Sequence, residues 1–159
     1  MVFHMKGQGA TEYLVLLAVV LIIALVSIAL LGFFPGLAAD AKITQSNTYW
    51  RGEARPVSIV EHSFSNTTGG MVLLNNDASG TITISGITLK AASDKSVAGN
   101  YNGTAFSLAS GQQATVNVTL TSAGTTSGTY EYDVEIAYKT PNNLDATQYG
   151  MKPIVGKFN

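Results

Sequence analysis

The sequence predicts an α+β protein: a long N-terminal hydrophobic α-helix, kinked near Pro35, followed by an antiparallel, immunoglobulin-like β-sandwich head. Three observations support this fold class. The stretch from Tyr13 to Leu31 is almost wholly apolar, and it is too long for a strand. Beyond it the composition changes to Ser, Thr, Gly and Asn, with repeated alternation of apolar and polar residues between turn signals. No second helical pattern follows, so we expect a helix over residues 8–48 and one β domain over residues 49–159.

Composition narrows the classes of function. The chain has 159 residues, with 9 Lys and Arg, 10 Asp and Glu, 2 His and no Cys. A net charge of −1 gives no basic surface for nucleic acid, so we expect no nucleic-acid partner. The lack of Cys excludes disulfides, thiolate metal sites and thiol nucleophiles, and one His beyond the first seven residues makes a histidine triad hard to build. We therefore expect no enzymatic activity, no cofactor and no metal site.

The apolar stretch is long enough to cross a membrane. Its 19 residues, of which only Ser27 is polar, form a helix about 29 Å long, close to the hydrocarbon thickness of a bilayer. Because it is apolar on all sides, a membrane or the interior of a helical assembly is the expected surrounding. Proline at Pro35 kinks the helix, and a helical pattern resumes at Leu37. Trp50, the single Trp, is expected to pack the helix against the head rather than to anchor it at a membrane interface.

The head shows about seven candidate strands, each with alternating apolar residues or bounded by turn signals. They cover residues 57–62, 71–74, 82–89, 106–108, 113–121, 130–139 and 150–158. In the third, the apolar face is kept only if one residue is inserted near Gly86, which predicts a β-bulge. Asn102-Gly103 predicts a type I′ hairpin turn. The last strand is expected at a sheet edge, because Pro153 cannot donate to a ladder.

A charged and glycine-containing junction precedes the helix. It reads Lys6-Gly7-Gln8, and Glu12 follows at the mouth of the apolar run. A carboxylate at the helix N-terminus complements the helix dipole, which explains an acid in this region but not the flanking Lys-Gly. Within lipid such a carboxylate is costly, and it usually has a partner.

These residues resemble the class III signal peptide of archaeal type IV-like pilins, over Lys6 to Phe34. The resemblance implies that residues 1–7 are a leader, removed after Gly7 by a membrane-embedded prepilin peptidase. Gln8 becomes the new N-terminus, and the helix stays on the mature protein. It also implies that Glu12, the fifth mature residue, pairs with the N-terminal amine of a neighbouring subunit during assembly. Archaellins use the same export route but typically lack this glutamate, so Glu12 favours a pilus.

The resemblance implies a structural subunit of an adhesion pilus, polymerising with copies of itself. An assembly ATPase and a membrane platform protein are the implied partners, and the precursor is held in the cytoplasmic membrane with its head outside. Two alternatives stay open. The chain could be a membrane-anchored extracellular binding module that does not polymerise, or a secreted β-sandwich released after Ala39 or Ala41, where small residues follow the apolar run.

Three sequons for N-glycosylation occur, at Asn66, Asn102 and Asn117. With the head expected outside the cell, we expect at least one to be glycosylated. Other polar residues give weaker signals. Neighbours on a strand face opposite sides, so His62 and Glu61 are interpreted as ordinary strand residues. The carboxylates at 131, 133 and 135 are typical of a solvated face rather than a calcium site, and the tyrosines at 130, 132 and 138 share the phase of the core.

Overall fold

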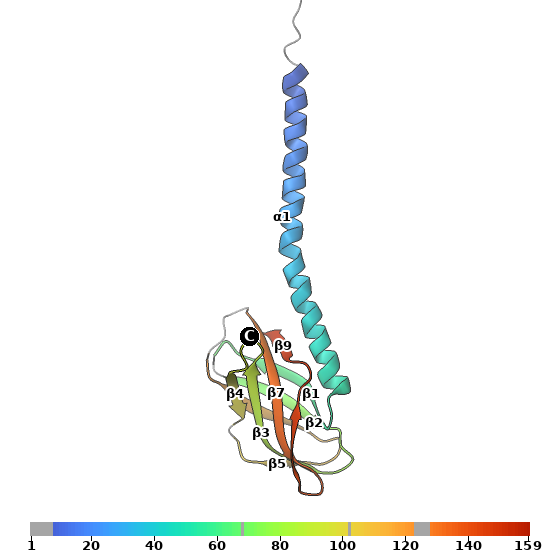
Figure 1. Cartoon of the computed structure of the whole chain (residues 1–159), viewed down its shortest axis with the longest axis vertical. Helices are drawn as coiled ribbons and strands as arrows, with labels where there is room; N and C mark the ends of the chain where they lie inside the picture. Colours follow the sequence, from blue (N-terminus) through green and yellow to red (C-terminus); the bar gives the residue numbers. More distant parts are fainter. Residues whose placement is uncertain (1–7, 68, 102, 123–127) are drawn as a thin grey trace, which may run out of the picture. The chain divides into compact units, whose positions relative to one another are not determined.

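A computed structural model describes residues 8–67, 69–101, 103–122 and 128–159 (Figure 1). The chain divides into two compact units, the first ending at Asp40 and the second comprising Ala41–Asn159. An N-terminal helix, a short π-helical turn and an antiparallel β domain follow one another along the chain. The predicted fold class, a long apolar helix followed by an immunoglobulin-like β-sandwich, is therefore confirmed.

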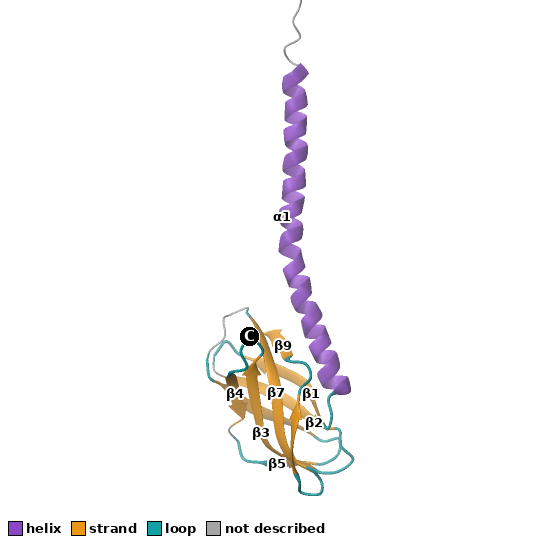
Figure 2. Ribbon diagram, in the orientation of Figure 1, coloured by secondary structure: helices purple, strands orange, loops and turns teal. Residues whose placement is uncertain are grey.

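The helix α1 extends from Gln8 to Thr48 without interruption (Figure 2). It continues through Pro35, as the resumed helical pattern after that residue predicted, because a proline removes only its own amide donor from the ladder. The kink at Pro35 stays a prediction. Within the apolar stretch the hydroxyl of Ser27 donates to the carbonyl of Ile23 at 2.7 Å, so the polar group is satisfied inside the helix. A π-helical turn, η1 (Tyr49–Glu53), leads into the head.

The described part of the head contains nine strands, where about seven were expected. They are β1 (Val57–Phe64), β2 (Gly69–Asn76), β3 (Ile82–Ala91), β4 (Val97–Tyr101), β5 (Phe106–Leu108), β6 (Gln113–Leu120), β7 (Thr129–Lys139), β8 (Asp145–Tyr149) and β9 (Ile154–Lys157). The sequence analysis missed β4 and β8 because both are short and lack alternating large apolar residues. These two segments are strands because neighbouring strands pair with them: β4 pairs with β3 and β6, and β8 pairs with β7.

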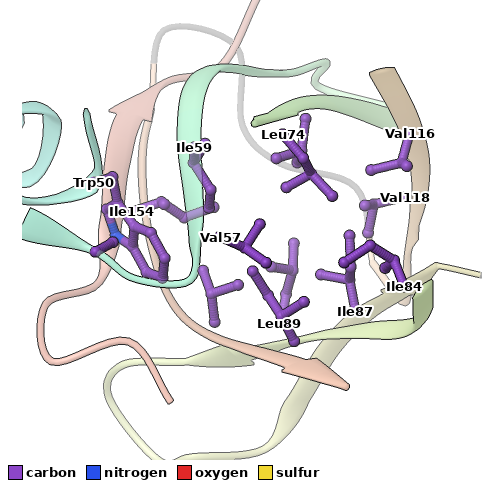
Figure 3. Packing of buried hydrophobic residues seen from close by; sticks show 14 of the residues in the cluster. Trp50, Val57, Ile59, Leu74, Ile84, Ile87, Leu89, Val116, Val118 and Ile154 are labelled. Atoms are coloured by element: carbon purple, nitrogen blue, oxygen red, sulfur yellow. The ribbon is translucent and has the colours of Figure 1, made fainter. Parts of the chain in front are cut away.

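The strands are paired in the order β1-β2-β6-β4-β3-β7-β8, with β5 on β3 and β9 on β7. All pairs are antiparallel, and β4 links one layer to the other by bonding to both β6 and β3. In the described pairings β9 contacts β7 alone, which confirms the edge position predicted from Pro153. The interior between the layers is filled by apolar side chains (Figure 3). Leu74 and Val116 come from one layer, and Ile87 and Leu89 from the other.

Two local predictions about turns and bulges have different outcomes. The β-bulge near Gly86 is confirmed, because the register of β3 against β7 shifts between Ile84 and Gly86. The hairpin at Asn102-Gly103 is wrong. Asn102 lies outside the described residues, but the strands on either side of it, β4 and β5, both pair with β3. They are successive segments along one edge of β3, so the dipeptide does not join two strands paired with each other.

Buried polar side chains join segments that the sheet ladder leaves apart. Gln148 on β8 is 7% exposed, and its side-chain amide bonds to both backbone groups of Val57 at the start of β1. The Val57 N–H donates to Oε1 at 2.9 Å, and Nε2 donates to the Val57 carbonyl at 2.8 Å. Asn76 is fully buried and donates to the carbonyls of Gly80 and Leu108. These side-chain amides therefore satisfy backbone groups of Val57, Gly80 and Leu108 in place of strand-to-strand hydrogen bonds.

The end of α1 is packed into the second unit. The hydroxyl of Ser46 donates to the carbonyl of Pro153 at 2.8 Å and accepts the N–H of Val155 at 3.1 Å. Trp50 is 1% exposed, and its indole N–H donates to the carbonyl of Lys152 at 3.0 Å. This confirms that Trp50 packs against the head, and its burial excludes the alternative of a membrane-interface anchor in this fold.

Candidate functional site

The apolar surface of α1 is the most distinctive feature of the described chain. From Tyr13 to Leu31 its large apolar side chains are 45% to 70% exposed, although each would gain about 1.5–3 kcal/mol on full burial. The helix is long and apolar enough to cross a membrane. Apolar side chains on all of its sides indicate a lipid or helical surrounding. The helix is compatible with a membrane-anchored or surface protein.

Glu12 is the only charged residue between Gln8 and Ala39. Its side chain is exposed on α1, four residues after Gln8, so the two positions share one helix face. Gln8 is the first residue of α1, and Lys6 and Gly7 lie outside the described residues. In an apolar surrounding the Glu12 carboxylate requires a cation or hydrogen-bond donors. The arrangement therefore fits a charge that is satisfied by another molecule.

The predicted glycosylation sites have different surroundings. Asn117 is exposed in the middle of β6, between Val116 and Val118, which are buried. Asn66 is half-buried in the β1–β2 connection, where its backbone N–H donates to the carbonyl of Asn159 at 3.0 Å and its Oδ1 accepts a hydrogen bond from Ser65. Asn102 lies outside the described residues. Of Asn66 and Asn117, only Asn117 presents an exposed side chain.

His62 has a partner that the sequence analysis missed. Its Nδ1 lies 2.8 Å from the hydroxyl of Tyr130, across the space between β1 and β7. Burial, and to a smaller extent the charge of Arg51, lowers the pKa of His62 to about 4. Burial, with a contribution from Tyr132, raises the pKa of the Tyr130 hydroxyl. Both groups are therefore neutral at pH 7, and the half-buried His62 is hydrogen-bonded to the buried Tyr130, which agrees with the interpretation of His62 as an ordinary strand residue.

The carboxylate row on β7 is neutralised by lysines from three different segments. The pairs are Lys42–Glu131, Lys95–Asp133 and Lys90–Glu135. These side chains are all at least a quarter exposed, so each pair adds little stability. Among the described residues, no group of three or more His, Cys, Asp or Glu could hold a metal ion. The geometry agrees with a solvated face made of ion pairs.

Several positions that matter in the structure gave no signal in the sequence. Ser46, Gln148 and Met71 are ordinary polar or apolar residues in their local patterns. Ser46 and Gln148 acquire their roles from backbone groups 91 to 109 residues away along the chain. Met71 lies directly opposite Asn117 on the neighbouring strand. Such long-range partners cannot be deduced from spacing alone.

Comparison with known proteins gives little further information. No protein-family model matches the chain, and no curated protein sequence matches it. Solved structures similar to this chain include the following two. The PapD-like domain 7 of human CEP192, an ASH/PapD-like domain, has a TM-score of 0.36 and 14% identity, over 67% of this chain and 87% of that one. A chain of the complex of the Salmonella enterica SafA pilin with the SafB chaperone has a TM-score of 0.40 and 17% identity. That match covers 64% of this chain and 55% of the other, so this chain spans about half its length. At these TM-scores and identities, neither likeness indicates a function.

Proposed function

We propose that this protein is a structural subunit of an archaeal type IV-like adhesion pilus, which polymerises through α1 after its leader is removed at Gly7. One observation carries the proposal: α1 exposes apolar side chains on all sides, with Glu12 as its single charge near the start. A simple membrane anchor needs the apolar surface but no carboxylate at this position. A filament subunit needs both.

The assembly step follows from the physical chemistry of α1. The precursor is held in the membrane by the apolar helix, with the head outside. On assembly, α1 exchanges lipid for other apolar helices, which is nearly neutral for the side chains, so helix packing and polar contacts determine the arrangement. The carboxylate of Glu12 leaves water only when it is paired, and the free amine of Gln8 on a neighbouring subunit is the partner that cleavage creates. The segment from Lys6 to Phe34 resembles archaeal type IV-like pilins, and this resemblance implies a prepilin peptidase, an assembly ATPase and a membrane platform protein as partners.

The first test is the N-terminal sequence and intact mass of the protein in material sheared from cells. A start at Gln8 with the apolar helix retained supports the proposal. A start near Asp40 or Lys42, without the helix, contradicts it and indicates a secreted domain. An intact N-terminus found only in membranes also contradicts it and indicates a simple anchor.

The second test replaces Glu12 by Gln, which keeps the size of the side chain and removes its charge. We expect the variant to be processed and held in the membrane but absent from sheared filaments, because the subunit amine has lost its partner. Glu53→Gln is the matched control, since Glu53 is an exposed carboxylate in η1, and it should assemble normally. Normal filaments from Glu12→Gln would refute the role of the carboxylate.

A further inference from the structure

The two outer faces of the head differ in charge. The β7 face carries the three lysine–carboxylate pairs described above. On the β6 strand the exposed side chains are uncharged: Gln113, Thr115, Asn117 and Thr119, with Met71 on the adjoining strand β2. The exposed carboxylate of Glu61 on β1 lies on the same face, in register with Leu73 and Thr115. Around Asn117 and Met71 themselves the side chains are amides, hydroxyls and one thioether, which suit a neutral, hydroxyl-rich ligand.

Asn117 and Met71 are close neighbours on this face. They are cross-strand partners in the β2–β6 ladder, and Met71 is 54% exposed. The carbonyl of Gln112 accepts the N–H of Asn76 from the β2 side. Backbone groups of successive residues point to opposite edges of a strand, so the even residues of β6 bond to β2 and Asn117 does not. Asn117 and Met71 thus form a non-hydrogen-bonded pair, the class with Cα atoms about 4.5 Å apart.

A hollow of about 410 Å³ adjoins Asn117 on the same side of the sheet. Its lining side chains are uncharged and include Ser63, Met71 and Thr119. Gly69 forms part of its floor, and a Cβ added there would meet nothing within 4 Å. The hollow thus combines an apolar surface, hydroxyl groups and bare backbone, and it is open to solvent.

We propose that Asn117 carries an N-linked neutral oligosaccharide whose first sugar ring packs in this hollow, over Met71 and Gly69. The C–H face of a pyranose suits the thioether, and its hydroxyls lie within reach of Ser63 and Thr119. This proposal rests on the proposed function to the extent that the head must be exported. It assigns the modification to one sequon and identifies the surface of the protein that the first sugar ring contacts.

The covalent step is a glycosyl transfer from a lipid-phosphate-linked oligosaccharide. The Nδ2 of Asn117 forms a bond to the sugar C1, the bond between C1 and the phosphate oxygen breaks, and the lipid phosphate leaves with that electron pair. The amide loses one proton to the transferase base, and nothing is oxidised or reduced. Because Asn117 lies in mid-strand against β2, the transfer precedes the pairing of β6 with β2.

The modification is tested by peptide mass mapping of the full chain from the cells that produce it. We expect an oligosaccharide mass on the peptide that contains Asn117. Asn117→Gln and Thr119→Ala should lose this mass, and the matched control Thr119→Ser should keep it because the sequon is intact. An unmodified Asn117 on a chain that starts at Gln8 overturns the proposal while leaving the filament function in place. A modified Asn117 on an unprocessed chain supports it and contradicts the filament function.

The packing of the sugar in the hollow is tested by thermal unfolding of the detergent-solubilised full chain. Loss of the sugar in Asn117→Gln should lower Tm by a few degrees. In a Met71→Ala background the same substitution should have a smaller effect, because the sugar has lost its contact surface. If Asn117→Gln lowers Tm by the same amount with Met71 and with Met71→Ala, the sugar does not pack on Met71, and this part of the proposal is wrong.

Discussion

Replacing Gln148 by Met is the sharpest test of how the sheet is closed. Met keeps the length of the side chain but offers neither a donor nor a strong acceptor. The N–H and C=O of Val57, which is fully buried, then lose their partners at 2.9 and 2.8 Å. Leaving two buried backbone groups unpaired costs about 2–6 kcal/mol together. At roughly 4 °C per kcal/mol for a domain of this size, we expect Tm to fall by about 8–24 °C.

The assay is thermal and urea unfolding of the full chain in detergent, followed by circular dichroism of the β signal. Gln113→Met is the matched control, because Gln113 is exposed on β6 and the same substitution there should change stability by no more than about 0.5 kcal/mol. If Gln148→Met and Gln113→Met unfold at the same temperature, the two hydrogen bonds to Val57 do not hold β8 to β1. The reasoning from unpaired backbone groups would then be wrong.

Two further predictions concern the head. The pKa of His62 is lowered to about 4 by burial and by Arg51, against about 6.5 in the unfolded chain. Between these values the unfolded chain binds the extra proton, so His62 should reduce the unfolding free energy by about 3 kcal/mol as pH falls from 7 to 4. His62→Gln should lack this part of the slope in urea titrations, and parallel curves would contradict the prediction. Gly150→Ala should destabilise the head by about 1–3 kcal/mol, because a Cβ there would overlap the buried ring of Trp50. Gly52→Ala, where a Cβ meets nothing within 4 Å, is its control, and equal unfolding midpoints for the two variants would refute the clash.

The strands with strong periodicity were predictable, and those without it were not. In β6 and β7 apolar residues alternate with polar ones, and both strands lie where this pattern placed them. The bulge at Gly86 also followed from a phase slip in the pattern. In contrast, β8 has the sequence Asp-Ala-Thr-Gln-Tyr, which contains no apolar stripe. It is a strand because β7 offers a free edge and Gln148 fixes its other side to Val57.

For the candidate site the same division holds. The apolar run and the single charge of Glu12 are local properties, so the sequence was sufficient to single them out. The difference in exposure between the sequon residues Asn66 and Asn117 depends on residues far away in the chain. Asn66 and Asn117 share the same motif, and only the folded chain exposes Asn117 beside Met71 while it places Asn66 against Asn159.

The sequence by itself determined the long apolar helix, the β class of the head and the position of the charge, because periodicity and composition act over a few neighbouring residues. Only the tertiary structure decided the strand order, the closure of the sheet by Gln148, the hydrogen bond of Trp50 to Lys152 and the partner of His62. Each of these depends on contacts between residues far apart in the chain, such as the 91 residues between Val57 and Gln148. Packing and hydrogen-bond satisfaction select such partners only when the whole core has formed.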